Sequence, residues 1–235
     1  MFKITKIIYF LFIAFITSNG IAQDSIPKIT GDLKYRDDQF YIGITYNIIA
    51  SVPNGVNPDG LTGGVNFGFL RDMPINKNRN IAIAAGLGLA FDRYGQNLFI
   101  DKDFEGKTTY IVLDSDVSFK SNNFNTGILE LPLELRWRSS TPTTYKFWRV
   151  YAGFRLGYTF WHESSYKDST NSISHSDIEE YEKLRFATTL SLGFNKFNFY
   201  VNYSLNPFFN EDALTTDGEL VGFKTLKLGL MFYIL

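Results

Sequence analysis

Apolar residues alternate with charged or polar residues at every second position, and this pattern constrains the chain more than any other feature. Between residues 129 and 137 every odd position is leucine or tryptophan, and the even positions are mostly Glu and Arg. A period of two places neighbouring side chains on opposite faces of a β-strand, whereas a helix requires a period near 3.6. The stretch is therefore predicted to be a strand with one apolar face and one charged face.

The same alternation recurs along the chain. The expected strands are 40–48, 65–69, 83–91, 129–137, 148–160, 186–194, 197–205 and 226–234. Connections after the second, fourth and sixth strands are short, and the other connections are mostly longer and polar. An even number of strands with short turns on one side and long loops on the other is typical of outer-membrane barrels.

The first residues indicate export. Lys3 and Lys6 precede an apolar run over 7–16, and small and polar residues follow up to Ala22. The run is too short to span a bilayer and is typical of a secretory signal peptide. The expected organisation is a cleaved signal peptide over 1–23, a periplasmic N-terminal segment over 24–38 and a barrel over 39–235.

Composition narrows the classes of protein to which the chain can belong. The chain has no cysteine, which excludes disulfides, thiolate metal sites and a lipid-modified N-terminal cysteine. A net charge of -1 gives no reason to expect a nucleic-acid partner, and no segment after the signal is apolar for long enough to form a transmembrane helix. An exported chain with 17% aromatic residues is then either a soluble β-protein or a transmembrane β-barrel.

The expected height of the aromatic residues decides between these two classes. Two girdles are predicted on the outward face: Phe40, Phe69, Trp137, Trp148, Phe194, Phe197 and Phe232 at the short-turn end, and Tyr158 and Phe160 at the long-loop end. Membrane interfaces select such girdles, whereas a soluble lipocalin-like barrel has no reason to arrange aromatics by height. We therefore predict an all-β, eight-stranded antiparallel up-and-down barrel in the outer membrane, with short periplasmic turns and longer extracellular loops.

In that barrel the charged faces point into the lumen. The inward charged residues are Glu130, Glu134, Arg136, Arg149, Arg155, Arg185 and Lys227. An eight-stranded barrel is just wide enough for side chains to fill, and an unpaired charge in it is costly. Symmetric closure about the 139–146 turn places Glu130 opposite Arg155 and Glu134 diagonal to Arg149. A salt-bridged plug is the favoured interpretation, and a narrow, gated, anion-preferring pore is the alternative.

Several sequence blocks resemble a known family. The blocks "YRDDQFYIGITYN", "GFLRDMPINKNRNIAIAAGLGLAFDRYGQNLFI", "LELPLELRWRS" and "YAGFRLGY" are similar to the PorT-like outer-membrane β-barrel family of the Bacteroidetes. The resemblance implies an outer-membrane location. For the family's namesake it also implies a part in protein export by the type IX secretion system.

The loops offer two weak chemical motifs. The stretch "DKDFEG" over 101–106 begins like a calcium-binding EF-hand loop, but Val112 stands where a bidentate Glu is required, so an acidic surface loop is expected. His162 and Ser164, with Glu180 and Glu182 nearby in the expected fold, faintly resemble the outer-membrane lipid A deacylases. This makes a lipid-modifying hydrolase facing the lipid a second functional alternative.

The turn "RDMPINKNRN" carries a basic patch that is the candidate docking site for a partner. Its residues are Arg71, Asp72, Lys77 and Arg79. The leading expectation is a non-enzymatic barrel without cofactor or metal, acting as a structural or accessory subunit of an envelope complex for secretion or barrel assembly. Its expected partners are outer-membrane lipid and other subunits of that complex, and no nucleic acid.

Overall fold

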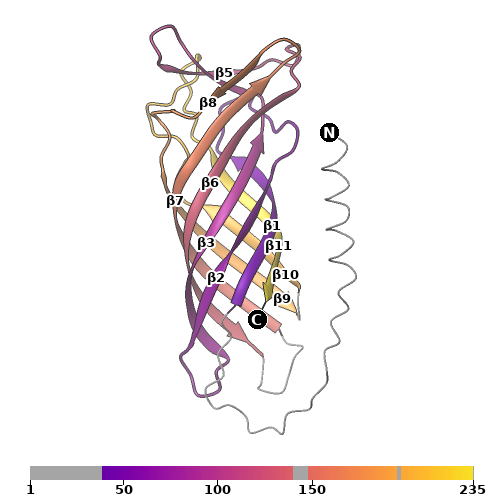
Figure 1. Cartoon of the computed structure of the whole chain (residues 1–235), viewed down its shortest axis with the longest axis vertical. Helices are drawn as coiled ribbons and strands as arrows, with labels where there is room; N and C mark the ends of the chain where they lie inside the picture. Colours follow the sequence, from indigo (N-terminus) through magenta and orange to yellow (C-terminus); the bar gives the residue numbers. More distant parts are fainter. Residues whose placement is uncertain (1–38, 140–147, 195–196, 235) are drawn as a thin grey trace, which may run out of the picture. The chain divides into compact units, whose positions relative to one another are not determined.

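The computed structural model describes residues 39–139, 148–194 and 197–234 (Figure 1). The expected signal peptide and N-terminal segment lie outside these ranges. The strands are β1 (Gln39–Ala50), β2 (Gly63–Pro74), β3 (Ile81–Gly95), β4 (Leu98–Lys102), β5 (Thr108–Val112), β6 (Ser121–Arg138), β7 (Trp148–Lys167), β8 (Ser172–His175), β9 (Leu184–Phe194), β10 (Phe197–Ser204) and β11 (Lys224–Ile234). No helix in the described ranges is long and apolar enough to cross a membrane.

Eight of the described strands close into an antiparallel ring. Their order is β1, β2, β3, β6, β7, β9, β10 and β11, and β11 pairs back with β1 from Phe40↔Ile234 to Ala50↔Lys224. Side chains alternate along each strand between the outer wall and the interior; on β1, for example, exposed and buried positions alternate from Gln39 to Asn47. The predicted closed, eight-stranded up-and-down barrel is confirmed.

The connections also follow the predicted alternation of length. β2 and β3 are joined by a short turn at one end of the barrel, whereas the loops containing β4, β5 and β8 lie at the other end (Figure 1). These three additional strands are not expected from the sequence. β4 and β5 form a hairpin of their own, and β8 adds to the end of β7 outside the ring.

The long loops pack into a hydrophobic cap, which we call the loop cap. Every long loop contributes to it, together with the loop-side ends of β3 and β6. Its buried members are Val56, Tyr94, Leu98, Ile100, Tyr110, Phe124, Ile178, Tyr181, Phe208, Phe209, Ala213, Val221 and Phe223. Aromatic rings dominate the packing: Phe209 lies 5.5 Å from both Phe124 and Tyr110 and 5.8 Å from Phe223 between ring centroids. The loops at this end are therefore a folded unit with its own core.

A β-bulge interrupts the β6–β7 pairing near the loop cap. Ile128 pairs with Thr159 but Gly127 pairs with Trp161, so β7 contains one extra residue at Phe160. Both Phe160 and Trp161 face outward, and the residues beyond them have inverted orientation. The Phe160 ring packs directly over Gly127. A Cβ at this position would crowd the ring, so glycine fits here better than any larger residue. A bulge of this kind re-aims every side chain that follows it.

Candidate functional site

The outer wall carries the predicted aromatic girdle residues. At the short-turn end Phe40 packs on Phe69 at 5.2 Å, and Trp148 packs on Phe194 at 5.1 Å, between ring centroids. At the loop end, Tyr158 and Phe160 are about half exposed on the same wall. Trp137, Phe197 and Phe232 also lie on this wall, and the Phe197 and Phe232 rings are 5.9 Å apart. Their role at the two membrane interfaces remains a prediction.

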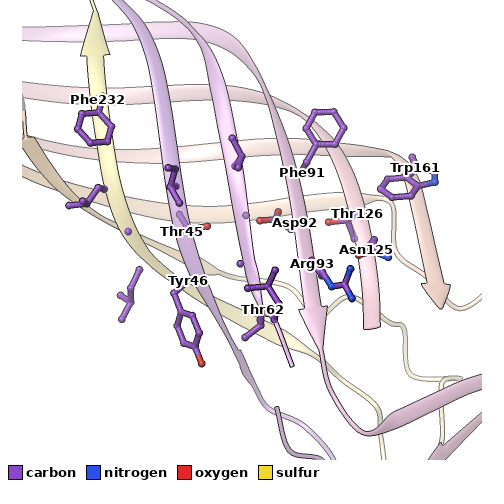
Figure 2. A pocket seen from close by; sticks show the side chains of 18 residues that line it. Thr45, Tyr46, Thr62, Phe91, Asp92, Arg93, Asn125, Thr126, Trp161 and Phe232 are labelled. Carbon is purple, nitrogen blue, oxygen red and sulfur yellow. The ribbon is translucent and has the colours of Figure 1, made fainter. Parts of the chain in front are cut away.

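A hollow of about 790 Å³ lies on the outer wall, reaching from the loop-side ends of β2 and β3 to Phe232 on β11, and we call it the outer-wall hollow. Figure 2 shows Phe91 and Trp161 on the strands to one side of it and Phe232 on the other. Its lining is mainly apolar, and Gly63, at an outward position of β2, adds no side chain to it. Arg93 is the cation at its rim.

The lumen contains a connected network of ion pairs. Near the short-turn end, Asp72 accepts from Arg136 Nη1 at 3.3 Å and from Arg138 Nη2 at 2.9 Å, and all three side chains are fully buried. Arg136 Nε also donates to Glu134 at 3.0 Å. The ring of Tyr151 lies 4.7 Å from the Arg136 guanidinium carbon, where its negative face stabilises the cation.

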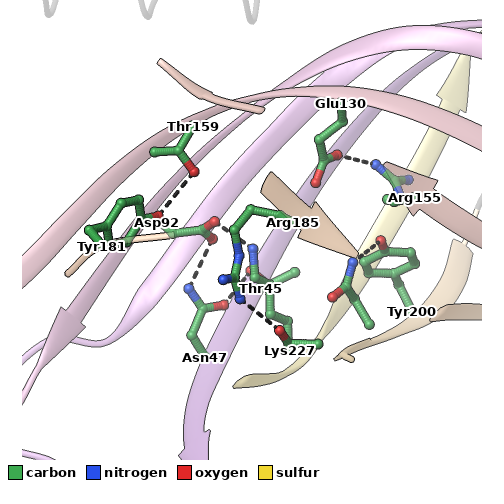
Figure 3. Close-up of polar contacts among 12 residues, drawn as sticks. Thr45, Asn47, Asp92, Glu130, Arg155, Thr159, Tyr181, Arg185, Tyr200 and Lys227 are labelled. Carbon is green, nitrogen blue, oxygen red and sulfur yellow. Dashed lines mark hydrogen bonds and ion pairs between the residues drawn. The ribbon is translucent and has the colours of Figure 1, made fainter. Parts of the chain in front are cut away.

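Arg155 continues this network towards the middle of the lumen. It pairs with Glu130 and lies 3.9 Å from Glu134, measured from Nη2 to Oε1 (Figure 3 shows the Glu130 pair). Its Nη1 donates to the Tyr41 hydroxyl at 3.3 Å, and the rings of Tyr41 and Tyr200 flank the guanidinium at 5.2 and 5.4 Å. Tyr41 reaches this position because Gly88 on β3 leaves space; a Cβ at Gly88 would overlap the Tyr41 hydroxyl.

A second group of polar contacts lies closer to the loop cap (Figure 3). Lys227 on β11 pairs with Asp92 on β3, and Asn47 Nδ2 donates to the same carboxylate at 3.0 Å. Arg185 differs from the expectation of a salt bridge. Within the described chain it donates to the carbonyl oxygens of Pro207 and Asn206 and to the Ser204 hydroxyl, and it lies 4.1 Å from the Phe208 ring centroid.

The predicted β6–β7 register is wrong by two residues. Glu130 pairs in register with Gly157, and Arg155 with Pro132, so Glu130 and Arg155 meet diagonally. Glu134 lies opposite Gly153, with Tyr151 diagonal to it in place of Arg149, and Arg149 is a buried lumen residue opposite Arg138. The error arises because symmetric closure was assumed to centre on residues 139–146, whereas the observed centre lies one residue later.

Two lumen charges were missed by sequence reasoning, namely Asp72 and Asp92, and Arg138 was placed on the inward face but left out of the expected ion-pair network. Asp72 and Asp92 continue the inward positions of their strands, but the expected strands ended too early to include them. Asp72 was instead assigned to the docking patch, and this assignment is wrong because its side chain is fully buried between two arginines. Extending the period of two by three residues on β2 and by one residue on β3 would have found both.

The rest of the basic turn is divided between two environments. Arg71 lies on β2 and faces outward, next to the girdle residue Phe69. Lys77 is exposed in the turn itself. Arg79 has a positive φ of 55° and is half-buried, and its carbonyl accepts a hydrogen bond from Arg138 Nε at 3.1 Å. Lys77 is therefore the residue of the patch that most clearly faces the solvent.

One small cavity lies among the charged residues of the lumen. A cavity of about 30 Å³ is lined by Glu130, Arg155, Arg185 and Lys227 together with smaller residues. That volume suits about one water molecule. Among the described residues, the lumen network and its neighbouring tyrosines occupy the barrel interior, and the loop cap packs over its loop end.

The weak chemical motifs do not form the arrangements that were considered. His162 and Ser164 follow the bulge and point inward, so the expectation that they face lipid is wrong. The His162 ring stacks on Tyr181 at 4.3 Å. Glu180 accepts from the Tyr110 hydroxyl at 3.3 Å, and Glu182 is exposed.

The acidic stretch over 101–106 forms the end of β4 and the turn of the β4–β5 hairpin. Asp103 Oδ1 accepts from the backbone amides of Glu105 and Lys107, both at 2.9 Å, so it stabilises the turn. Asp101 contacts His175 on β8 at 2.8 Å. Among the described residues, no cluster of three or more His, Cys, Asp or Glu side chains is arranged to hold a metal ion.

A closed barrel with an apolar outer wall, a filled polar interior and alternating turn lengths defines an integral outer-membrane β-barrel protein. The chain belongs to the outer membrane protein beta-barrel domain family, whose model matches residues 21–210. The predicted outer-membrane location is thereby confirmed, and the short turns face the periplasm in this class. This match identifies the family as a whole and does not distinguish the PorT-like subgroup within it.

Comparison with solved structures finds Ail, the attachment invasion locus protein of Yersinia pestis, in complex with the heparin analogue sucrose octasulfate. The identity is 14%, the match covers 85% of this chain and 99% of Ail, and the TM-score is 0.33. A similarity at this level supports no functional inference. None of the curated proteins compared with the chain matches it.

Proposed function

We propose that this protein is a non-conducting, non-enzymatic barrel that serves as a structural or accessory subunit of an outer-membrane complex. The complex would be of the secretion or barrel-assembly type, as the resemblance to PorT-like barrels suggests. The observation that carries the proposal is the filled interior: paired charges occupy the lumen, and a hydrophobic core packs over its loop end. A barrel that transports nothing through its lumen acts through its outer surfaces.

Two surfaces are available for such contacts. The outward aromatic residues offer an apolar wall to a neighbouring barrel, and large aromatic side chains are common anchors at protein interfaces. The basic turn offers Lys77 to partners in the periplasm. Lysine at this height also meets lipid head groups, so the partner contact requires a direct test.

The test is purification of the tagged protein from its native outer membrane in a mild detergent, followed by mass spectrometry. Stoichiometric companions from a secretion or assembly complex are expected. Lys77→Glu should reduce their yield, whereas the matched charge reversal Lys107→Glu, which lies on the opposite side of the membrane in the β4–β5 hairpin, should not. Recovery of the barrel alone in every preparation would overturn the proposal.

Planar-bilayer recording distinguishes this proposal from the narrow pore. The wild-type barrel is expected to show no steady conductance, because paired charges and tyrosine rings occupy the described lumen. A stable, anion-selective conductance that changes in Glu130→Gln would favour the pore instead.

Lipid analysis distinguishes the proposal from the hydrolase. Lipid A is expected to be identical in cells with wild-type protein and with His162→Ala, since His162 points inward and stacks on Tyr181. A modification of lipid A present only with the wild-type protein would overturn the non-enzymatic assignment.

A further inference from the structure

The outer-wall hollow combines an apolar surface with a positive charge at one height. Ile44, Val65 and Phe91 line it from outward-facing positions, and Gly63 adds only backbone to the lining. Phe91 is seen at the side of the hollow in Figure 2. Its volume of about 790 Å³ falls within the range of roughly 300–1,000 Å³ that small-molecule sites occupy. Contact with lipid requires a barrel wall to be apolar but does not require it to be concave, so the hollow calls for a separate explanation.

Arg93 marks the loop-side rim of the hollow. It lies two residues beyond Phe91 on β3, faces outward and is exposed. Within the described part of the chain the guanidinium has no ion-pair partner. Asn125, its register partner on β6, also lines the hollow.

Arg93 lies at the height expected for the interface of the membrane with the outside. Tyr46 and Trp161 lie at the same rim and are 57% and 40% exposed, and tyrosine and tryptophan prefer the level of the head groups. Beyond Trp161, the outward residues of β7 are Glu163 and Ser165, so the apolar wall ends there. Arg93 therefore sits at head-group level, with the apolar hollow extending below it into the membrane.

We propose that the outer-wall hollow binds a phosphorylated glycolipid of the outer leaflet. An acyl chain would lie along the apolar hollow, and a phosphate group would accept hydrogen bonds from Arg93, whose planar guanidinium suits phosphate oxygens. The loop end of the barrel faces the outer leaflet, which in outer membranes is built from phosphorylated glycolipid. The inference rests on the outer-membrane location and is independent of the proposed subunit role.

The experiment uses the purified barrel in non-ionic detergent, titrated with lipid A that carries its phosphates and with dephosphorylated lipid A. Bound lipid is counted by native mass spectrometry. Arg93→Gln is expected to weaken binding of phosphorylated lipid A about fivefold, the effect of one Arg at a membrane surface. Ile44→Trp, which fills the hollow from a lipid-facing position that is 60% exposed, is expected to weaken binding of both lipids.

Two matched variants control for general effects on the barrel. Arg71→Gln removes an outward cation at the periplasmic end, and Leu131→Trp enlarges a lipid-facing side chain on β6 outside the hollow. Neither should change lipid A binding, and heat-modifiable migration checks that all four variants are folded. Equal losses in test and control variants, equal binding of dephosphorylated lipid A, or equally tight binding of phosphatidylglycerol would each overturn the proposal.

Discussion

At the scale of single residues, the Asp72 carboxylate is held by two ion pairs at once. Asp72 is fully buried and contacts two fully buried guanidiniums, at 3.3 Å and 2.9 Å. Its strand neighbour Arg71 points to the opposite side of the wall. Adjacent residues of one strand therefore meet the lumen and the lipid, and their substitution should have very different effects.

Asp72→Asn is predicted to destabilise the barrel by about 3–5 kcal/mol, the usual cost of removing one partner from a buried ion pair. The substitution keeps the shape of the side chain but removes the charge that Arg136 and Arg138 both contact. Urea unfolding of the barrel in lipid vesicles measures the change. Arg71→Gln is the control, and similar midpoints for the two variants would contradict the prediction.

The residue pattern revealed much of this site but not its pairings. Alternation identified the inward glutamates and arginines of β6 and β7. Once a segment is a strand, odd and even positions must face opposite sides, whatever the strand pairs with. The pairing of Arg155 with Glu130 across a diagonal depends on register, and register depends on the conformation of a turn whose length alone was known. The sequence pattern also contains no sign of the bulge at Phe160, which turned His162 inward.

At the scale of elements, the unexpected part is the loop cap. Its buried residues come from loops and strand ends and follow neither a period of two nor one of 3.6, so the pattern that predicted the ring could not predict the cap. The ring strands could be predicted because lipid outside and charges inside impose strict alternation. The cap is stabilised instead by contacts between loops that are distant in sequence.

Phe209→Ala is predicted to loosen the cap and leave the ring intact. Phe209 is 1% exposed and contacts four other aromatic rings, so truncation should cost about 3–5 kcal/mol of local stability. Protease treatment of intact cells should cleave the loops faster, while heat-modifiable migration is unchanged. The control is Phe104→Ala at the exposed tip of the β4–β5 hairpin, where no change in cleavage is expected.

Two loops of the cap are joined by a contact that depends on pH. The Asn54 backbone and side-chain amides donate to the Glu219 carboxylate at 2.7 and 2.6 Å. The backbone bond holds the pKa of Glu219 below its ordinary value of 4.5. A lowered folded-state pKa means that the contact is present at neutral pH and is lost as pH falls through that pKa, below 4.5.

The prediction for this contact is a step in the protection of the Asn54 amide proton. Its exchange rate, divided by its intrinsic rate at the same pH, should rise as the pH falls and the hydrogen bond to Glu219 is lost. Hydrogen exchange across the range from pH 6 to pH 3, compared by mass spectrometry or NMR, measures it. In Glu219→Gln the step should disappear, and its persistence would assign the step to another group.

At the scale of the whole molecule, orientation in the membrane is the property that determines which partners each surface can meet. The short turns and the loop cap lie at opposite ends of the ring (Figure 1). The absence of cysteine from the sequence makes orientation directly measurable with single introduced thiols.

A membrane-impermeant maleimide is predicted to label Phe104→Cys on intact cells and Lys77→Cys only after the outer membrane is permeabilised. Ser164→Cys should stay unlabelled in both states because its side chain is only 2% exposed within the barrel. Labelling of Lys77→Cys on intact cells would reverse the assigned topology.

The pairing of the first and last strands of the ring has a consequence for biosynthesis. β1 leaves the ribosome before the other ring strands, but its partner β11 is the last of the ring strands to be made. β11 also carries the Lys227 ammonium that pairs with Asp92. Until β11 is exported, the edge of β1 and the Asp92 carboxylate lack these partners. An unpaired strand edge of this kind promotes aggregation. The incomplete chain must therefore be held unfolded across the periplasm, and a messenger truncated anywhere before β11 should yield only material for degradation.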